Sequence, residues 1–233
     1  MKTIVILLSG GVGTRLGSET PKQYIEVEGK PIIAYTMEAV EHSPLVDGIV
    51  VVAAEEWKAH VEKLAEDYHI TKFLSTAPAG ENRQRSCFSG LLEVERLGGC
   101  ENVVIHDAVR PFVTGGIIER GLRALENYDA ALSVIPIKDT PYMSTDGEKI
   151  TSLVDRKTLY AGQTPEYFNF SKYLAAMRAS TDEEIDTATG SAVIAYKRGL
   201  TVGLAKGEER NFKITTSEDL DRFLLEVRRG KAI

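Results

Sequence analysis

TIVILLSGGVGTRLGSETPKQY, residues 3 to 24, links a short apolar run to a glycine-rich turn and then to two cations. The β-branched run TIVILL favours a buried strand and is too short to span a membrane or to serve as a signal peptide. Gly10, Gly11 and Gly13 carry no side chain, so the backbone of the turn can approach a ligand closely, and its exposed N–H groups can bind an anion. The stretch therefore predicts a strand that ends at an anion-binding turn.

The same strand pattern returns along the chain, and segments of helical period separate the repeats. The strand candidates are residues 3 to 8, 48 to 54, 101 to 106, 129 to 137 and 200 to 205. The helix candidates are residues 31 to 43, 55 to 68, 83 to 97, 115 to 128 and 217 to 229, the last with Ser217 as its capped start. This alternation predicts an α/β fold, a mostly parallel twisted sheet flanked by helices.

One segment breaks the alternation. KDTPYMSTDGEKITSLVDRKTLYAGQTP, residues 138 to 165, has a D-G turn at Asp146 and Gly147 between two short strand-like pieces. We expect residues of about 138 to 160 to project from the sheet as a β-arm and to clasp a second subunit. No repeat or linker divides the 233 residues, so we expect residues 1 to 233 to form one domain.

Composition argues against several classes of protein. The formal net charge of −6 does not favour nucleic acid or an anionic membrane, and we expect neither as a partner. Cys87 and Cys100 lack a C-x-x-C spacing and the four histidines form no ligand pattern, so we expect neither a disulfide framework nor a zinc site. With no leader pattern, we expect a cytoplasmic protein.

Two cations follow the glycine turn. Arg15 and Lys22 could neutralise a polyphosphate. An NAD-dependent reductase is the competing interpretation, but its G-x-G-x-x-G fingerprint requires a third glycine where Leu16 stands, and Pro21 interrupts the next turn. For the glycines alone, a tight turn without a ligand remains an alternative.

Asp107 ends the apolar strand in NVVIHDAVRPFV, residues 102 to 113. Strand carboxyl ends are where open α/β sheets bind ligands, and a carboxylate there can hold Mg²⁺ against phosphate oxygens. Arg110 follows three residues later. A local Asp107–Arg110 ion pair that shapes the loop explains this motif equally well.

The motif GENRQRSCFSGL begins at Gly80, which permits a sharp turn before a helix that starts near Arg83. Backbone groups of Gly80 and Glu81, with the Ser86 hydroxyl, could contact the edge of a base while Arg83 faces a phosphate. The motif alone favours a simpler interpretation, in which Asn82 caps the helix and Ser86 solvates it.

The stretch NFKITTSEDL, residues 211 to 220, places Lys213 in a short strand-like piece before the last helix. Its apolar neighbours make a solvent-facing strand residue the default interpretation. Thr140, Arg156 and Thr164, in and beside the arm, are unremarkable individually.

Together these motifs resemble the 2-C-methyl-D-erythritol 4-phosphate cytidylyltransferases and the related ribitol 5-phosphate cytidylyltransferases. The resemblance runs over nearly the whole chain, through GGVGTRLG-x3-PKQY, GENRQRS, HDAVRP, DR-x6-QTP and NFKITT-x-EDL. It implies a nucleotide-diphospho-sugar transferase fold, which is Rossmann-like, and transfer of CMP from CTP to a sugar-alcohol phosphate with release of pyrophosphate. It also implies a homodimer in which each arm completes the neighbour's site.

The resemblance further implies roles for individual residues. The CTP phosphates would be held by Ser9, Gly10, Gly11, Gly13, Arg15 and Lys22. The cytidine side would be bound by Gly80, Glu81, Arg83 and Ser86. The acceptor and the reacting phosphate would meet Asp107, Arg110, Thr164 and Lys213, with Thr140 and Arg156 of the neighbouring subunit. Asp107 would hold Mg²⁺, and the catalytic cations would be Arg15, Lys22 and Lys213.

The chemistry needs no covalent intermediate and no general base, because the attacking phosphate is already anionic and the protein's task is positioning and charge neutralisation. One departure concerns the acceptor. Gly190 stands where we place the first acid of the T-D-[DE]-A run of the erythritol enzymes, and Asp186 lies nearby out of register. We expect 2-C-methyl-D-erythritol 4-phosphate as the acceptor, with D-ribitol 5-phosphate as the alternative.

Overall fold

A computed structural model describes residues 1–11 and 20–230. Its strands are β1 (Thr3–Leu8), β2 (Glu26–Val27), β3 (Lys30–Pro31), β4 (Gly48–Ala53), β5 (Phe73–Pro78), β6 (Asn102–Asp107), β7 (Ala130–Pro136), β8 (Tyr142–Met143), β9 (Ser152–Leu153), β10 (Tyr160–Asn169) and β11 (Val202–Lys206). Its α-helices are α1 (Ile32–Glu41), α2 (Lys58–Asp67), α3 (Arg83–Arg96), α4 (Gly115–Ala124), α5 (Phe170–Ala179), α6 (Asp182–Thr187), α7 (Ser191–Lys197) and α8 (Ser217–Arg228). Its short 3-10 turns are η2 (Lys22–Tyr24), η3 (Glu55–Trp57) and η4 (Arg156–Thr158). Among the described residues, no helix has the length and apolar character needed to cross a membrane.

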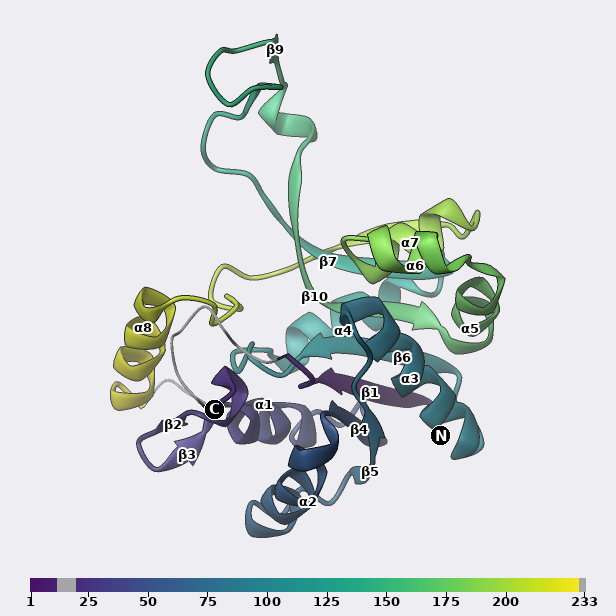
Figure 1. The fold of residues 1–233 in the computed structure, drawn as a ribbon, viewed down its shortest axis with the longest axis vertical. Coiled ribbons are helices and arrows are strands. Elements are labelled where there is room, and N and C mark those ends of the chain that lie inside the picture. The colour runs from purple at the N-terminus through teal and green to yellow at the C-terminus, as the bar shows by residue number, and fades with distance from the viewer. Residues whose placement is uncertain (12–19, 231–233) are drawn as a thin grey trace.

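The central sheet of the described chain has the strand order β11-β7-β10-β6-β1-β4-β5 (Figure 1). Strand β10 runs antiparallel to both of its neighbours, β6 and β7, while the other neighbouring pairs are parallel. The prediction of a mostly parallel sheet flanked by helices is therefore confirmed.

Helices cover the sheet on both faces, and the side chains of β1 show why. Val5 and Leu7 pack into one apolar cluster with residues of α1, α2 and α4. Ile4 and Ile6 point to the opposite face and pack with residues of α3, α5 and α7. Since successive side chains of a strand alternate between the faces, a continuous apolar run such as TIVILL has to be buried on both sides.

The predicted elements match the structure where the apolar pattern is strong, at β1, β4, β6, β7, β11, α1, α2, α3, α4 and α8. The strands and helices that were not predicted from the sequence are β2, β3, β5, β10, α5, α6 and α7. Strand β5 lies at a sheet edge and is only partly buried, so it lacks a continuous apolar run. Strand β10 begins in the exposed residues Tyr160, Ala161 and Gly162 at the base of the arm and contains Pro165, which argues against a strand in a single sequence.

Two local predictions near the C-terminus are wrong. Residues 212 to 215 form no strand, and this segment is tied down by a bond from the Ile214 N–H to the Val109 carbonyl oxygen. The last helix begins at Ser217, but its cap is Thr216, whose hydroxyl accepts from the Asp219 N–H while the Asp219 carboxylate accepts from the Thr216 N–H. A reciprocal capping box of this kind satisfies two backbone donors at once.

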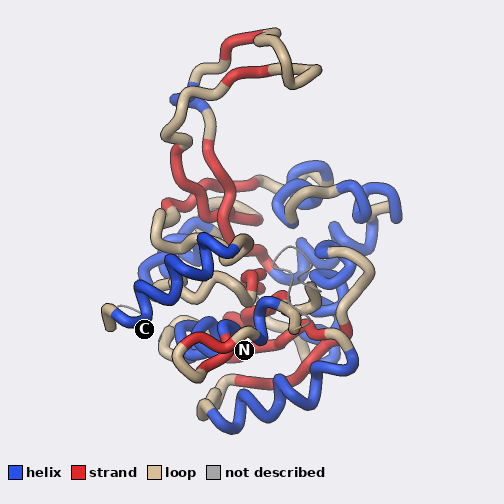
Figure 2. The backbone as a smooth tube through the Cα atoms, turned by 60° about the vertical axis from the view of Figure 1, so that its left-hand side comes forward, coloured by secondary structure: helices blue, strands red, loops and turns tan. Residues whose placement is uncertain are grey.

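The predicted arm leaves the sheet between β7 and β10 and projects well beyond it (Figures 1 and 2). Strands β8 and β9 pair antiparallel near its tip, on either side of the predicted turn, where Gly147 has a φ of 76°. Tyr142 and Leu153 on these strands expose 59% and 79% of their surface. These two large apolar side chains of the arm are therefore in contact with solvent in the single chain.

Gly121 on α4 lies against Tyr167 of β10, a fully buried ring whose hydroxyl donates to the Ile117 carbonyl oxygen. A Cβ at position 121 would lie 2.0 Å from the Tyr167 ring. We expect Gly121→Ala to lower the free energy of unfolding by about 1–3 kcal/mol, because overpacking a rigid site forces the backbone to move. Urea denaturation would measure the change.

Gly115→Ala on the same helix is the matched control, because a Cβ there would meet no described atom within 4 Å. Its effect should stay within about 0.5 kcal/mol. Equal losses in the two variants would contradict the close packing of α4 on β10.

Candidate active site

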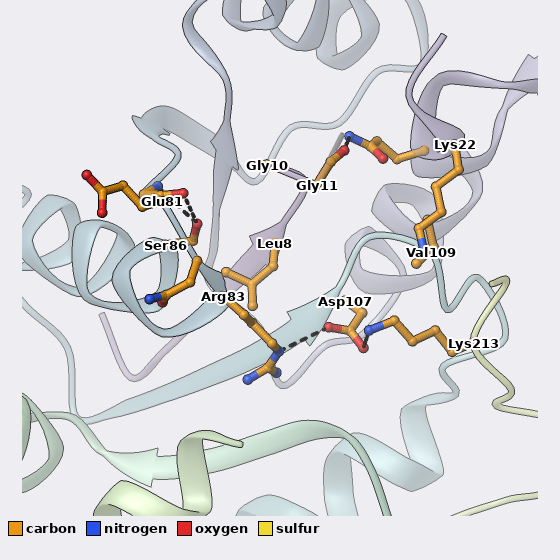
Figure 3. Close-up of a pocket in the computed structure, with 13 residues that line it drawn as sticks. Leu8, Gly10, Gly11, Lys22, Glu81, Arg83, Ser86, Asp107, Val109 and Lys213 are labelled. Carbon is orange, nitrogen blue, oxygen red and sulfur yellow. Dashed lines mark hydrogen bonds and ion pairs between the residues drawn. The ribbon is translucent and has the colours of Figure 1, made fainter. Parts of the chain in front are cut away.

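The carboxyl ends of β1 and β6 meet at one edge of the sheet, where Leu8 is the register partner of Asp107. Beside them lies a pocket of about 560 Å³, within the usual range for small-molecule sites (Figure 3). It is lined by Leu8, Gly10, Gly11, Lys22, Gln23, Gly80, Glu81, Asn82, Arg83, Ser86, Asp107, Val109 and Lys213. The structure thus brings together residues from four of the motifs that the sequence analysis selected.

The beginning of the glycine turn is held from behind by Gln23. This buried side chain donates from Nε2 to the carbonyl oxygens of Ser9 and Gly11, at 2.6 and 2.9 Å. Gly10 has no room for a side chain, since a Cβ would lie 2.5 Å from the Cβ of Ala79. Gly13 and Arg15 lie outside the described residues, so their predicted roles remain predictions.

The loop before α3 is shaped by its own residues. A Cβ at Gly80 would lie 2.5 Å from the Cβ of Arg85, and the Gly80 N–H donates to Ser86 Oγ at 3.0 Å. Asn82 caps the helix by accepting from the Arg85 N–H. The simpler interpretation of Asn82 is therefore confirmed, and the same loop also presents Gly80 and Glu81 to the pocket.

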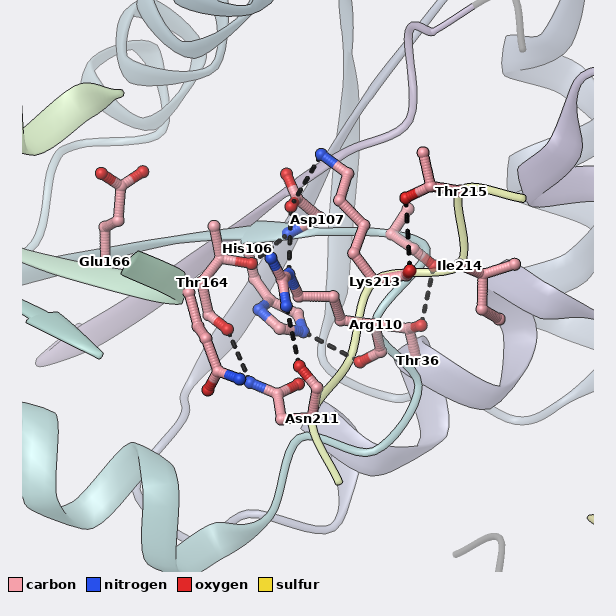
Figure 4. Close-up of polar contacts among 12 residues, drawn as sticks. Thr36, His106, Asp107, Arg110, Thr164, Glu166, Asn211, Lys213, Ile214 and Thr215 are labelled. Atoms are coloured by element: carbon pink, nitrogen blue, oxygen red, sulfur yellow. Dashed lines mark hydrogen bonds and ion pairs between the residues drawn. The ribbon is translucent and has the colours of Figure 1, made fainter. Parts of the chain in front are cut away.

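Asp107 is the electrostatic centre of the site. Its carboxylate lies 3.1 Å from Lys213 Nζ, 3.2 Å from Arg110 Nε and 3.6 Å from Arg83 Nε (Figures 3 and 4). Burial opposes ionisation of this carboxyl, but Lys213, Arg83 and Arg110 together hold its pKa well below the ordinary value. The local ion pair with Arg110 exists as the alternative interpretation expected, within a larger cluster of cations.

Lys22 and Lys213 reach the pocket from segments that are far apart in the sequence. Lys22 Nζ donates to the Ile214 carbonyl oxygen at 3.2 Å, next to Lys213. The Ile214 N–H in turn binds the Val109 carbonyl oxygen in the loop after β6. These contacts place two lysines on one side of Asp107, where they can meet an anionic ligand.

Arg110 and Thr164 lie behind Asp107 and are not among the described residues that line the pocket. Thr164 Oγ1 accepts from the Asp107 N–H at 3.1 Å, and the Thr164 carbonyl oxygen accepts from Asn211 Nδ2 (Figure 4). Arg110 donates to the Asn211 carbonyl oxygen. Burial lowers the pKa of the neighbouring His106 to about 4, so its imidazole is neutral at pH 7. This network fixes where Asp107 points.

Thr140 and Arg156 belong to the arm. Arg156 donates from Nη1 to the Lys138 carbonyl oxygen within the arm, and neither residue lines the pocket of its own chain. The structure of one chain therefore does not bring them to the other predicted site residues.

Two buried residues that contact the site were not predicted from the sequence. Gln23 directly follows Lys22 in the PKQY motif, and Glu166 comes two residues after Thr164. Their position beside predicted site residues was the only signal available. Whether a side chain points into the pocket depends on strand and loop geometry that a single sequence does not reveal.

A model of the family described as 2-C-methyl-D-erythritol 4-phosphate cytidylyltransferase matches residues 3–227 of the chain. The chain belongs to this cytidylyltransferase family. The alternative interpretation as an NAD-dependent reductase is therefore wrong.

Individual relatives of this family member carry two different names. The 2-C-methyl-D-erythritol 4-phosphate cytidylyltransferase of Geobacter metallireducens is 38% identical over 222 residues, which cover 94% of this chain and 95% of the relative. The ribitol-5-phosphate cytidylyltransferase of Streptococcus agalactiae is 33% identical over 227 residues, which cover 96% of this chain and 94% of the relative. The crystal structure of 4-diphosphocytidyl-2C-methyl-D-erythritol synthase from Anaerococcus prevotii superposes with a TM-score of 0.83 at 25% identity, covering 98% of this chain and 96% of that one.

The described residues contain no cluster of three or more His, Cys, Asp or Glu side chains that could hold a metal ion. Asp107 and Glu81 are the carboxylates among the described residues that line the pocket, and Asp107 is the one that lies among the site cations. Mg²⁺ commonly binds through one or two carboxylates and completes its shell with water and substrate phosphates. The site therefore fits Mg²⁺ that arrives with a nucleotide and does not fit a metal that the described residues hold by themselves.

Gln23→Glu should weaken CTP binding by about tenfold or more, because a carboxylate cannot donate to the Ser9 and Gly11 carbonyl oxygens and unpaired buried groups are costly. Isothermal titration with CTP and Mg²⁺ would measure the affinity. Gln163→Glu is the matched control, since Gln163 donates to the Glu208 carbonyl oxygen and does not line the pocket. Unchanged affinity in Gln23→Glu would show that the turn holds its shape without this side chain.

Proposed function

We propose that this family member transfers CMP from CTP to 2-C-methyl-D-erythritol 4-phosphate and releases pyrophosphate. The observation that carries the proposal is the convergence of Lys22, Arg83 and Lys213 with the Asp107 carboxylate on one pocket beside a glycine turn. Such a constellation suits a polyphosphate and its divalent cation. D-Ribitol 5-phosphate is the alternative acceptor, which the relative from Streptococcus agalactiae supports.

We assign the ends of CTP from the two loops that line the pocket. The turn at Gly10 and Gly11, with Lys22, would hold the phosphates through backbone N–H groups and charge. The loop at Gly80 and Glu81 would contact the base through its backbone, with Ser86 fixing the loop and Arg83 near the α-phosphate. The corresponding roles of Gly13 and Arg15 rest on the sequence. Ser9 is buried, its hydroxyl donates to the Tyr24 hydroxyl, and it does not line the pocket, so its predicted role also rests on the sequence.

In the proposed reaction, a phosphate oxygen of the acceptor attacks the α-phosphorus of CTP in line. A new P–O bond forms as the bond to the β-phosphate oxygen breaks, and the electron pair leaves with pyrophosphate. Asp107 would hold Mg²⁺, which neutralises charge on the phosphate oxygens when it is bound. Lys213, which now lies 3.1 Å from Asp107, would turn toward the reacting phosphate.

We further propose a homodimer in which each arm reaches the partner's site. The exposed apolar side chains near the arm tip support this, as does the placement of Thr140 and Arg156 away from their own pocket. These two residues would bind the acceptor phosphate in the partner. We also propose the cytoplasm as the compartment, because both Cys87 and Cys100 are free thiols.

The reaction is tested by pyrophosphate release with CTP and Mg²⁺, when 2-C-methyl-D-erythritol 4-phosphate and D-ribitol 5-phosphate are offered separately. We expect faster turnover of the erythritol phosphate. Lys22→Ala and Lys213→Ala should each lower kcat/KM on the order of 100-fold or more, since each removes a cation from the reacting phosphates.

Lys172→Ala is the control for a lost lysine, because Lys172 pairs with Asp129 outside the pocket, and it should leave the rate unchanged. Preference for ribitol phosphate would select the alternative acceptor. Absence of pyrophosphate with either acceptor would overturn the proposed reaction.

The shared site is tested by complementation between two inactive variants. Lys22→Ala damages the pocket, and Arg156→Ala damages the arm. In a mixed dimer, the unaltered pocket of the Arg156→Ala subunit meets the unaltered arm of the Lys22→Ala subunit, so one of the two sites stays intact. Mixed dimers isolated through two different affinity tags should recover about half of the wild-type activity, since an isologous dimer has two equivalent sites. Mixed dimers as inactive as either parent would contradict an arm that acts in the neighbouring subunit.

A further inference from the structure

Glu166 is a buried carboxylate at the edge of the site that the proposed chemistry does not use. It lies on β10, opposite Ile105 of β6 and Leu132 of β7, so its backbone is held from both sides of the strand. The residue is only 3% exposed. A charged side chain this deeply buried requires hydrogen-bond partners, and each carboxylate oxygen of Glu166 accepts a hydrogen bond.

The two oxygens of Glu166 bind different elements. Oε2 accepts from Arg83 Nη2 at 2.9 Å, and Oε1 accepts from the Ala192 N–H at the start of α7 at 2.9 Å. Arg83 is also held by Ser191, whose hydroxyl oxygen accepts from Arg83 Nη1 at 3.0 Å. Both terminal nitrogens of the Arg83 guanidinium are therefore held on the side of β10 and α7.

This arrangement decides how Arg83 meets Asp107. The Arg83 Nε lies 3.6 Å from Asp107 Oδ1, which is ion-pair distance but longer than a hydrogen bond (Figure 3). The Arg83 Nη2 lies 2.9 Å from Glu166, so Glu166 holds the guanidinium more closely than Asp107 does. Arginine binds carboxylates best through two parallel bonds, and Asp107 would be the nearest other carboxylate for such a pair.

The charges around Asp107 show why this matters. Arg83, Arg110 and Lys213 surround it, and each carries a positive charge. Glu166 supplies the second negative charge of the cluster. Without Glu166, three cations would face a single carboxylate. Their combined positive charge would repel a divalent cation, and Arg83 would be drawn onto the Asp107 oxygens that the divalent cation needs.

We propose that Glu166 is a positioning residue that holds Arg83 away from Asp107, and so keeps an Asp107 oxygen available to the divalent cation that enters with the nucleotide phosphates. The inference rests on the proposed function, since it assumes that a nucleotide and a cation bind this pocket. Glu166 itself touches neither of them. It acts through Arg83.

Mn²⁺ binding provides a test that does not depend on turnover. Free Mn²⁺ is followed by electron paramagnetic resonance in the presence of the α,β-methylene analogue of CTP, whose bridging carbon prevents cleavage. Binding by the protein is the loss of free Mn²⁺ beyond that in the same mixture without protein. Glu166→Gln keeps an oxygen for the Ala192 N–H but loses the charge that holds Arg83. We expect it to weaken Mn²⁺ binding by about 10- to 100-fold, the usual effect of removing an outer partner of a metal site.

The same substitution in an Arg83→Met variant distinguishes a positioning role of Glu166 from general structural support. In Arg83→Met there is no guanidinium to swing onto Asp107, so adding Glu166→Gln should change Mn²⁺ affinity by less than about twofold. Glu208→Gln is the matched control, because Glu208 pairs with Arg120 and does not line the pocket. It should bind Mn²⁺ as the wild type does.

Two results would overturn the inference. Glu166→Gln could bind Mn²⁺ as tightly as the wild type, or it could lose affinity equally in the Arg83→Met background, which would indicate general damage to the fold. Failure of the proposed function is recognised separately, because the wild type would then bind no Mn²⁺ with the CTP analogue and release no pyrophosphate.

Discussion

The carboxylate of Asp107 is the constraint on which the rest of the site depends. It is buried at the carboxyl end of β6, and a charge in that position is stable only because Lys213, Arg83 and Arg110 lie within ion-pair distance. Each cation comes from a different part of the chain. The loop before α8, the start of α3 and the loop after β6 are therefore drawn to the same point.

The sheet supplies the rigid frame for this cluster. Parallel pairing of β1 with β6 brings Leu8 level with Asp107, so the glycine turn after β1 and the carboxylate share one edge. The antiparallel strand β10 pairs beside β6 and contributes Thr164 and Glu166 from its own length. Because strand pairing sets these positions through backbone bonds, the site geometry does not depend on loops alone.

In the structure Lys213 and Arg83 are paired with carboxylates, so binding of a phosphate by these two cations requires an exchange of partners. Lys213 interacts with Asp107, and Arg83 is divided between Asp107 and Glu166. A polyphosphate offers stronger acceptors than a shared carboxylate, because each phosphate carries several charged oxygens. The carboxylates hold these cations in defined positions, and such preorganisation reduces the cost of binding.

Strong apolar periodicity made much of the fold predictable from the sequence. TIVILL, the run that ends at Asp107, and the amphipathic helices between strands indicated an α/β sheet because burial on both faces demands continuous apolar strands. The glycine turn and Lys22 were predicted as a phosphate site because such a site needs bare backbone and positive charge, and Gly10, Gly11 and Lys22 do line one pocket. Edge strand β5 and strand β10 were not, since partial burial and polar residues weaken the pattern.

The sequence by itself determined the fold class and the family motifs, and it predicted an anion-binding turn, all from residues that are close together in the chain. Tertiary structure alone decided the partners of each charge. Glu166 meets Arg83 across 83 positions of sequence, and Lys22 meets Ile214 across 192. Contacts of this kind depend on strand order and on the direction in which each side chain leaves its strand, and local sequence patterns carry neither.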